Sequence, residues 1–134
     1  MSGERASPRL IDQRHRNLII DQLETLADGD AAVRPQGATE YFNAFFSLCP
    51  IDESDPLINM AMTEAEHAAW DSVFRLMDQA ANATSSRVTD EELLTSGWPR
   101  RIASVAAEAV RVFLERGRSS EEIEEAELAA PPSH

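Results

Sequence analysis

The chain has 134 residues, a formal net charge of −12 and twelve cationic side chains, every one of which is an arginine. Without lysine it lacks the amine that forms a Schiff base, the lysine of a phosphate-binding loop and a lysine general base. The single cysteine, Cys49, excludes an internal disulfide. The length suits one domain, because a chain of this size can bury about two thirds of its unfolded surface.

The first predicted element is a helix over residues 8–28. Ser7 followed by Pro8 is typical of a helix start, and Gly29 is placed to end the helix. Apolar residues recur at helical spacing and should face the core: Ile11, Leu18, Ile19, Leu23, Leu26 and Ala27.

Residues 28–37 are expected to form a loop, because Pro35 and Gly37 interrupt any regular pattern. A short helix is predicted over residues 39–48, and Pro50 ends it. Four residues would share one face of this helix and form the centre of the core: Phe42, Phe45, Phe46 and Cys49.

Residues 51–56 should form an acidic loop, followed by one loose turn over residues 57–62. Thr63 and Glu66 then have the spacing of a capping box at the start of a helix over residues 64–82. The apolar stripe of this helix consists of Trp70, Val73, Phe74, Met77 and Ala81.

A second capping box, formed by Thr89 with Glu92, begins a short helix that Gly97 ends. Pro99 lies in the first turn of a last long helix, which we expect to continue to about residue 116. Its apolar stripe consists of Ile102, Val105, Ala106, Ala109, Val112 and Phe113.

Two interpretations are open for residues 119–128. Ser119 and Glu122 could cap a weakly docked helix, or the segment is a solvated acidic tail, which its low apolar content favours. Residues 129–134 are expected to be disordered.

These elements predict an all-α fold, because no segment alternates apolar and polar residues as a strand would. We expect one domain over residues 1–134, a small bundle of about five helices, three longer and two short, with an acidic C-terminal tail. Its ordered helical core should cover about residues 8–117. Residues 1–7 and 118–134 are expected to be flexible or weakly docked ends.

Two histidines follow a carboxylate by three residues, since Asp12 precedes His15 and Glu64 precedes His67. A carboxylate and an imidazole at this spacing share one helix face, as the ligands of helical di-metal sites do. The pattern therefore permits a site for iron, manganese or zinc. The alternative is that both histidines complete hydrogen bonds inside the fold, with carboxylates placed near helix starts by the helix dipole.

Arg100 and Arg101 lie in the first turn of the last helix, where two guanidinium groups could bind an anion or a partner carboxylate. We favour the alternative that both pair with acidic residues of the same chain. The segment can be forced into helix-turn-helix form, but the net charge of −12 argues against binding to nucleic acid or an anionic membrane.

The sequence contains no motif of a known catalytic class and no apolar run of the roughly 20 residues needed to span a membrane. We therefore predict a cytoplasmic, non-enzymatic protein-binding or regulatory module, from a GC-rich bacterial genome, whose acidic surface suits a basic protein partner. Of the two alternatives, one is a metal-binding bundle or metalloenzyme with the ligands described above. The other is a homodimer, for which Leu10 and Ile20 are the candidate contacts.

Overall fold

The structure, a computed structural model, describes residues 7–50 and 57–124. Within these residues it contains six helices and no strand, so the predicted all-α class is confirmed and the predicted count of about five helices is approximately correct. The helices are α1 (Pro8–Ala27), α2 (Asp30–Gln36), α3 (Ala38–Phe46), α4 (Glu64–Ala83), α5 (Asp90–Ser96) and α6 (Trp98–Leu114).

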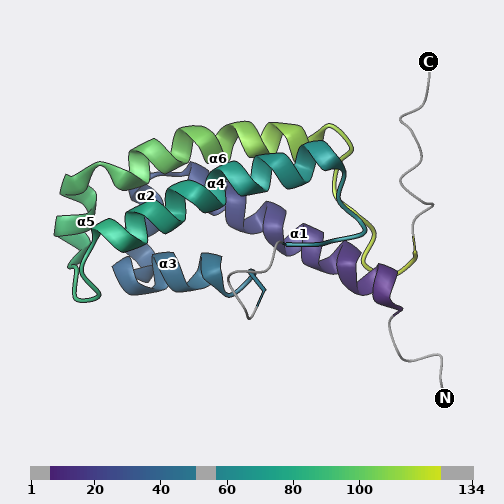
Figure 1. The fold of residues 1–134 in the computed structure, drawn as a ribbon, viewed down its shortest axis with the longest axis horizontal. Coiled ribbons are helices and arrows are strands. Elements are labelled where there is room, and N and C mark those ends of the chain that lie inside the picture. Colours follow the sequence, from purple (N-terminus) through teal and green to yellow (C-terminus); the bar gives the residue numbers. More distant parts are fainter. Residues whose placement is uncertain (1–6, 51–56, 125–134) are drawn as a thin grey trace.

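The three long helices, α1, α4 and α6, form the body of the molecule (Figure 1). Helix α6 packs against both α1 and α4, and it runs beside α4 in the opposite direction. The short helices α2, α3 and α5 gather around the end where α4 finishes and α6 begins. The first turns of α1 lie at the other end, close to the chain that follows α6.

Local capping signals fix the starts of three helices where the sequence predicted them. The side chain of Ser7 accepts a hydrogen bond from the Leu10 amide at 3.1 Å at the start of α1. Thr63 and Thr89 both form complete capping boxes at the starts of α4 and α5. Gly97, with a φ of 85°, separates α5 from α6 in the left-handed conformation that glycine adopts readily.

Helix α2 corrects the prediction of a loop throughout residues 28–37. Gly29, with a φ of 65°, turns the chain at the end of α1, and the new helix then buries Val33 completely in the core. Pro35 is tolerated because it lies in the last turn of a helix of two turns, where its missing N–H removes a single hydrogen bond. Burial of Val33 offsets that loss.

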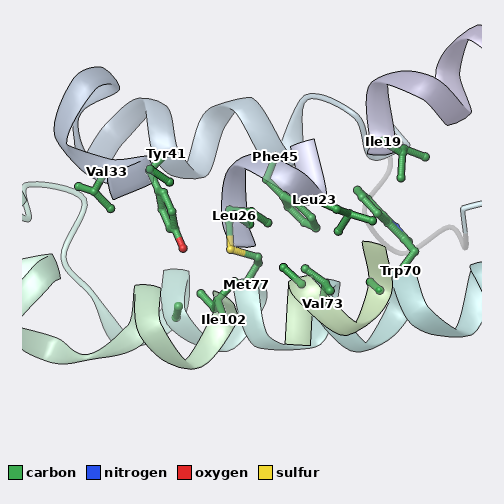
Figure 2. Close-up of a cluster of buried hydrophobic side chains, with 14 of the residues drawn as sticks. Ile19, Leu23, Leu26, Val33, Tyr41, Phe45, Trp70, Val73, Met77 and Ile102 are labelled. Carbon is green, nitrogen blue, oxygen red and sulfur yellow. The ribbon is translucent and has the colours of Figure 1, made fainter. Parts of the chain in front are cut away.

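Of the four residues predicted to form the centre of the core, only one is buried. Phe45 is fully buried, and its ring stacks on Trp70 with centroids 4.6 Å apart and planes 16° apart. Phe42, Phe46 and Cys49 are only partly buried. Figure 2 shows the side chains that converge here from α1, α2, α3, α4 and α6, among them Leu23, Leu26, Val33, Tyr41, Val73, Met77 and Ile102.

The buried face of α1 differs from the predicted stripe in its first half. Ile11 and Leu18, predicted to be in the core, are each 53% exposed, whereas Ile20 is fully buried. The reason is that polar residues occupy the inward face of this half of the helix: Gln13, Arg16 and Asn17. A stripe drawn through the apolar residues alone therefore points in the wrong direction.

Residues 117–124, which we call the strap, follow α6 without forming a helix and lie against α1. Of the two interpretations of residues 119–128, the helical one is thus not realised as far as residue 124. The predictions for residues 1–6, 51–56 and 125–134 lie outside the described residues.

Candidate functional site

Three of the four predicted metal-ligand residues approach one common residue, Asn59, in the segment between α3 and α4. The Asn59 side-chain amide nitrogen donates to the main-chain oxygen of Asp12 at 2.9 Å and lies 3.2 Å from Nδ1 of His15. The Asn59 backbone N–H donates to Nε2 of His67 at 3.2 Å. Glu64, the fourth predicted residue, is exposed in the first turn of α4. Buried Asn59 therefore joins the two histidines.

Both imidazoles also use their remaining ring nitrogen inside the protein. Nε2 of His15 lies 3.0 Å from the Leu48 oxygen, and Nδ1 of His67 lies 2.9 Å from the Thr63 oxygen. A neutral His15 protonated at Nε2 and a neutral His67 protonated at Nδ1 satisfy all four ring nitrogens. The arrangement thus holds each ring in one tautomer.

A metal bound by the two histidines would have to replace Asn59. Among residues 7–50 and 57–124, no three His, Cys, Asp or Glu side chains are grouped closely enough to hold a metal ion. The metal site therefore stays a prediction from the sequence. Asn59 was missed because it lies in a segment without periodicity; its only signal is a lone polar residue between Ile58 and Met60.

The inward face of α1 carries a buried cation that the sequence analysis did not identify. Arg16 donates to Glu66 through Nε and Nη2, each at 3.0 Å, and both side chains are 1% exposed. Arg116, just after α6, donates to the other side of the same carboxylate at 3.0 and 2.8 Å. Burial by itself would raise the pKa of Glu66, but the hydrogen bonds and charges of the two guanidinium groups outweigh it and hold the pKa below its ordinary value.

Arg16 extends this ion pair into a junction between three helices and the strap. Its Nη2 donates to the Phe113 oxygen of α6 at 2.9 Å, and its guanidinium carbon lies 5.5 Å from the centre of the Phe113 ring. Its Nη1 donates to the Gly117 oxygen at 2.9 Å and to the hydroxyl of Ser119 at 3.0 Å. One side chain of α1 thereby donates hydrogen bonds to three other segments, which are α4, α6 and the strap.

The neighbouring polar residues of α1 bind the main chain of the strap. The Asn17 amide nitrogen donates to the Ser119 oxygen at 2.8 Å, while its Oδ1 accepts the Ser119 N–H, also at 2.8 Å. Gln13 donates to the main-chain oxygens of Ser120 and Ile123, both at 2.9 Å. These contacts are independent of the strap's side chains, because they involve backbone atoms.

Charged residues attach the strap at the surface of α1. Arg14 donates to the Glu121 main-chain oxygen at 2.8 Å. Arg118 of the strap forms ion pairs with Asp21 and Glu24, each at 2.7 Å. Because these groups are solvated, their ion pairs contribute less to stability than the buried ones do.

The two arginines predicted as an anion site lie in the first turn of α6 and have partners within the chain. Arg100 donates to the Leu94 oxygen at 3.3 Å, and its Nε lies 3.6 Å from the carboxylate of Asp30. The guanidinium carbon of Arg101 lies 4.4 Å from the centre of the Trp98 ring, a cation–π contact.

Most of the exposed large apolar residues of the described chain surround the first half of α1. Five of the six lie on α1 or beside residues bonded to it, and we call them the apolar rim: Ile11, Leu18, Ile58, Met60 and Ile123. The Met60 N–H donates to the Asp12 carboxylate at 2.9 Å, and Ile123 is held through its main-chain oxygen by Gln13. The sixth, Leu114, lies on α6 and is 41% exposed.

Leu10 and Ile20, the candidate contacts of a homodimer, are not part of this rim. Leu10 is half-buried and Ile20 is fully buried. Ile20 is therefore not accessible to a second copy, whereas Leu10 is partly accessible.

The comparisons with known proteins identify no family, because no family model, curated protein or solved structure matches the chain. None of the described helices is both long and apolar enough to cross a membrane.

Proposed function

We propose that this chain is a non-enzymatic protein-binding module that contacts a protein partner through the apolar rim around the first half of α1. The observation that carries the proposal is that Ile11 and Leu18 are exposed on α1, and that Ile58, Met60 and Ile123 are exposed in segments hydrogen-bonded to the first half of the same helix. An apolar area surrounded by polar residues is typical of a protein interface, and grouped exposure of this kind usually has a functional reason.

The charge around the rim indicates the kind of partner. Carboxylates at the same end are exposed, among them Glu64, Glu121, Glu122 and Glu124, and the whole chain carries a net charge of −12. A partner that adds basic side chains around an apolar contact would fit this surface. Such charges mainly accelerate association, so the association rate should fall as salt is added.

The polar residues of this end support a binding role better than a catalytic one. Arg16, Asn17 and Glu66 are buried and bond to one another's helices or to the strap. These bonds fix the shape of the surface. The metal-binding alternative, with iron, manganese or zinc at His15 and His67, stays a prediction. It is less well supported, because both rings are hydrogen-bonded to Asn59, which a metal ion would have to displace.

The proposal is tested with two substitutions on the exposed face of α1. Ile11 and Leu18 lie two helical turns apart and point outward, so Ile11→Asp with Leu18→Asp places two charges in the proposed contact without entering the core. Immobilised wild-type protein should capture one stoichiometric partner from the native lysate, and the double variant should bind that partner at least about tenfold more weakly.

Leu114→Asp is the matched control, because Leu114 is also an exposed leucine but lies on α6. It should capture the partner as the wild type does, and circular dichroism should show that all three proteins are folded. Equal capture by the double variant and the wild type would contradict the proposal. So would capture of a second copy alone, which would assign this end to a homodimer.

A further inference from the structure

The polar face of α1 is built to hold the main chain of a peptide. Gln13 and Asn17 contribute four hydrogen bonds to backbone atoms of Ser119, Ser120 and Ile123. All four are 2.8 or 2.9 Å long, and both side chains come from the buried face of the helix. An amide side chain that donates to the C=O and accepts the N–H of one residue recognises a peptide in any sequence.

Three side chains of the strap add specificity to these backbone contacts. Arg118 pairs with the carboxylates of Asp21 and Glu24. The Ser119 hydroxyl accepts a hydrogen bond from Arg16 at 3.0 Å, and the Glu121 carboxylate accepts one from Asn17 at 2.9 Å. The site therefore reads a cation, then a small hydroxyl residue, then a carboxylate two positions later.

The strap is held almost entirely by polar contacts, which makes it replaceable. Its one large apolar side chain, Ile123, is 71% exposed, and Ser119 is its only buried residue. Gly117, the first residue of the strap, has a φ of 75° and turns the chain away from α6. Each hydrogen bond that the strap loses to water costs little net free energy, and a competing peptide with the same pattern restores it.

We propose that the polar face of α1 is a peptide-binding site, occupied by the strap, which accepts a partner segment with the pattern cation–hydroxyl–any–carboxylate. This inference rests on the proposed function and names the partner chemistry. The strap directly follows Arg116 in the same chain, so it competes at a high effective concentration. It thereby limits binding to partners that make further contacts with the apolar-rim residues outside the strap, which are Ile11, Leu18, Ile58 and Met60.

The experiment measures whether the site binds the strap sequence as a separate peptide. The probe is a fluorescent, end-capped octapeptide with the sequence of residues 117–124. It should bind the full-length Ser119→Pro protein at least about tenfold more tightly than the wild type. The strap of that variant lacks the residue-119 N–H that Asn17 accepts and the hydroxyl to which Arg16 donates. Adding Asn17→Leu should abolish that gain, and adding the surface substitution Arg75→Ala should not. A peptide carrying Arg118→Ala and Ser119→Ala should bind about tenfold more weakly.

A second full-length protein guards against misfolding. Arg118→Glu reverses an exposed charge that pairs with Asp21 and Glu24, and should also loosen the strap without touching the core. Two results would contradict the proposed peptide-binding site. In the first, the octapeptide binds neither the Ser119→Pro nor the Arg118→Glu protein. In the second, it binds both proteins no more tightly than the peptide with Arg118→Ala and Ser119→Ala does. Failure of the peptide site can be distinguished from failure of the proposed function. In the Ser119→Pro protein, Ile11→Asp with Leu18→Asp should leave octapeptide binding unchanged, whereas in the wild type the same pair should weaken partner capture.

Discussion

At the scale of single residues, the dominant feature is one carboxylate between two guanidinium groups. Glu66 also accepts a hydrogen bond from the Thr63 N–H within the capping box. The same carboxylate therefore caps the N-terminus of α4 and pairs with Arg16 and Arg116. The sequence predicts only its capping role, because capping depends on spacing within four residues. The ion pairs join residues 50 apart in sequence, and nothing local distinguishes Arg16 from the other arginines.

Glu66→Gln should lower the free energy of unfolding at neutral pH and make that free energy less dependent on pH in the acidic range. The folded-state pKa of Glu66 lies below the ordinary value of about 4.3, so its carboxylate stabilises the fold above that value and the contribution is lost as the pH falls through the folded-state pKa. We expect a loss of about 3 kcal/mol in the free energy of unfolding at pH 7. Urea titrations at pH 7 and pH 3 should show a smaller difference between variant and wild type at the acidic pH.

The control for this prediction is Glu108→Gln, which breaks an exposed pair with Arg111. It should cost less than about 1 kcal/mol at either pH. A gap between Glu66→Gln and the wild type that is as large at pH 3 as at pH 7 would mean that the Glu66 charge is not what the two arginines stabilise.

At the scale of elements, capping residues and glycines predicted the bounds of most helices. Helices α1, α4, α5 and α6 were predicted within two residues at nearly every end, because caps and glycines specify them. Helix α2 and the strap were not, because tertiary contacts decide them. Val33 is held in α2 by burial, and the strap is held by side chains of α1 about a hundred residues earlier.

Thr63→Ala should lower stability through the start of α4. The Thr63 hydroxyl accepts the Glu66 N–H at 3.1 Å, and alanine leaves that amide without its partner. We expect a loss of about 1 kcal/mol in the free energy of unfolding, measured by urea titration. Ser72→Ala, on an exposed turn in the middle of the same helix, should change it by less than about 0.5 kcal/mol. Equal effects of the two substitutions would refute a specific capping contribution.

At the scale of the whole molecule, the sequence predicted the helical fold and the burial of Phe45 and Trp70 in its core, but not which end is the candidate surface. The apolar rim could not be predicted, because Ile11 and Leu18 are spaced along α1 as core residues would be. They are exposed in the fold because Gln13, Arg16 and Asn17 occupy the inward face of this half of the helix. The two Asp/Glu-x-x-His patterns did not determine whether His15 and His67 approach each other, because spacing within a helix does not fix the order of helices in space. What joins the two histidines is Asn59, an amide whose role depends on a segment without regular structure.

The most direct test of a partner-binding end is photo-crosslinking at single positions of the full-length protein in the cells that normally make it. A photoreactive amino acid at Ile11 or Leu18 should give one and the same protein adduct, because both side chains lie in the proposed contact. At Arg75, an exposed position of α4 that pairs only with Asp71 in the described structure, it should give none. The same adduct formed as efficiently at position 75, or no adduct at either α1 position, would contradict the account.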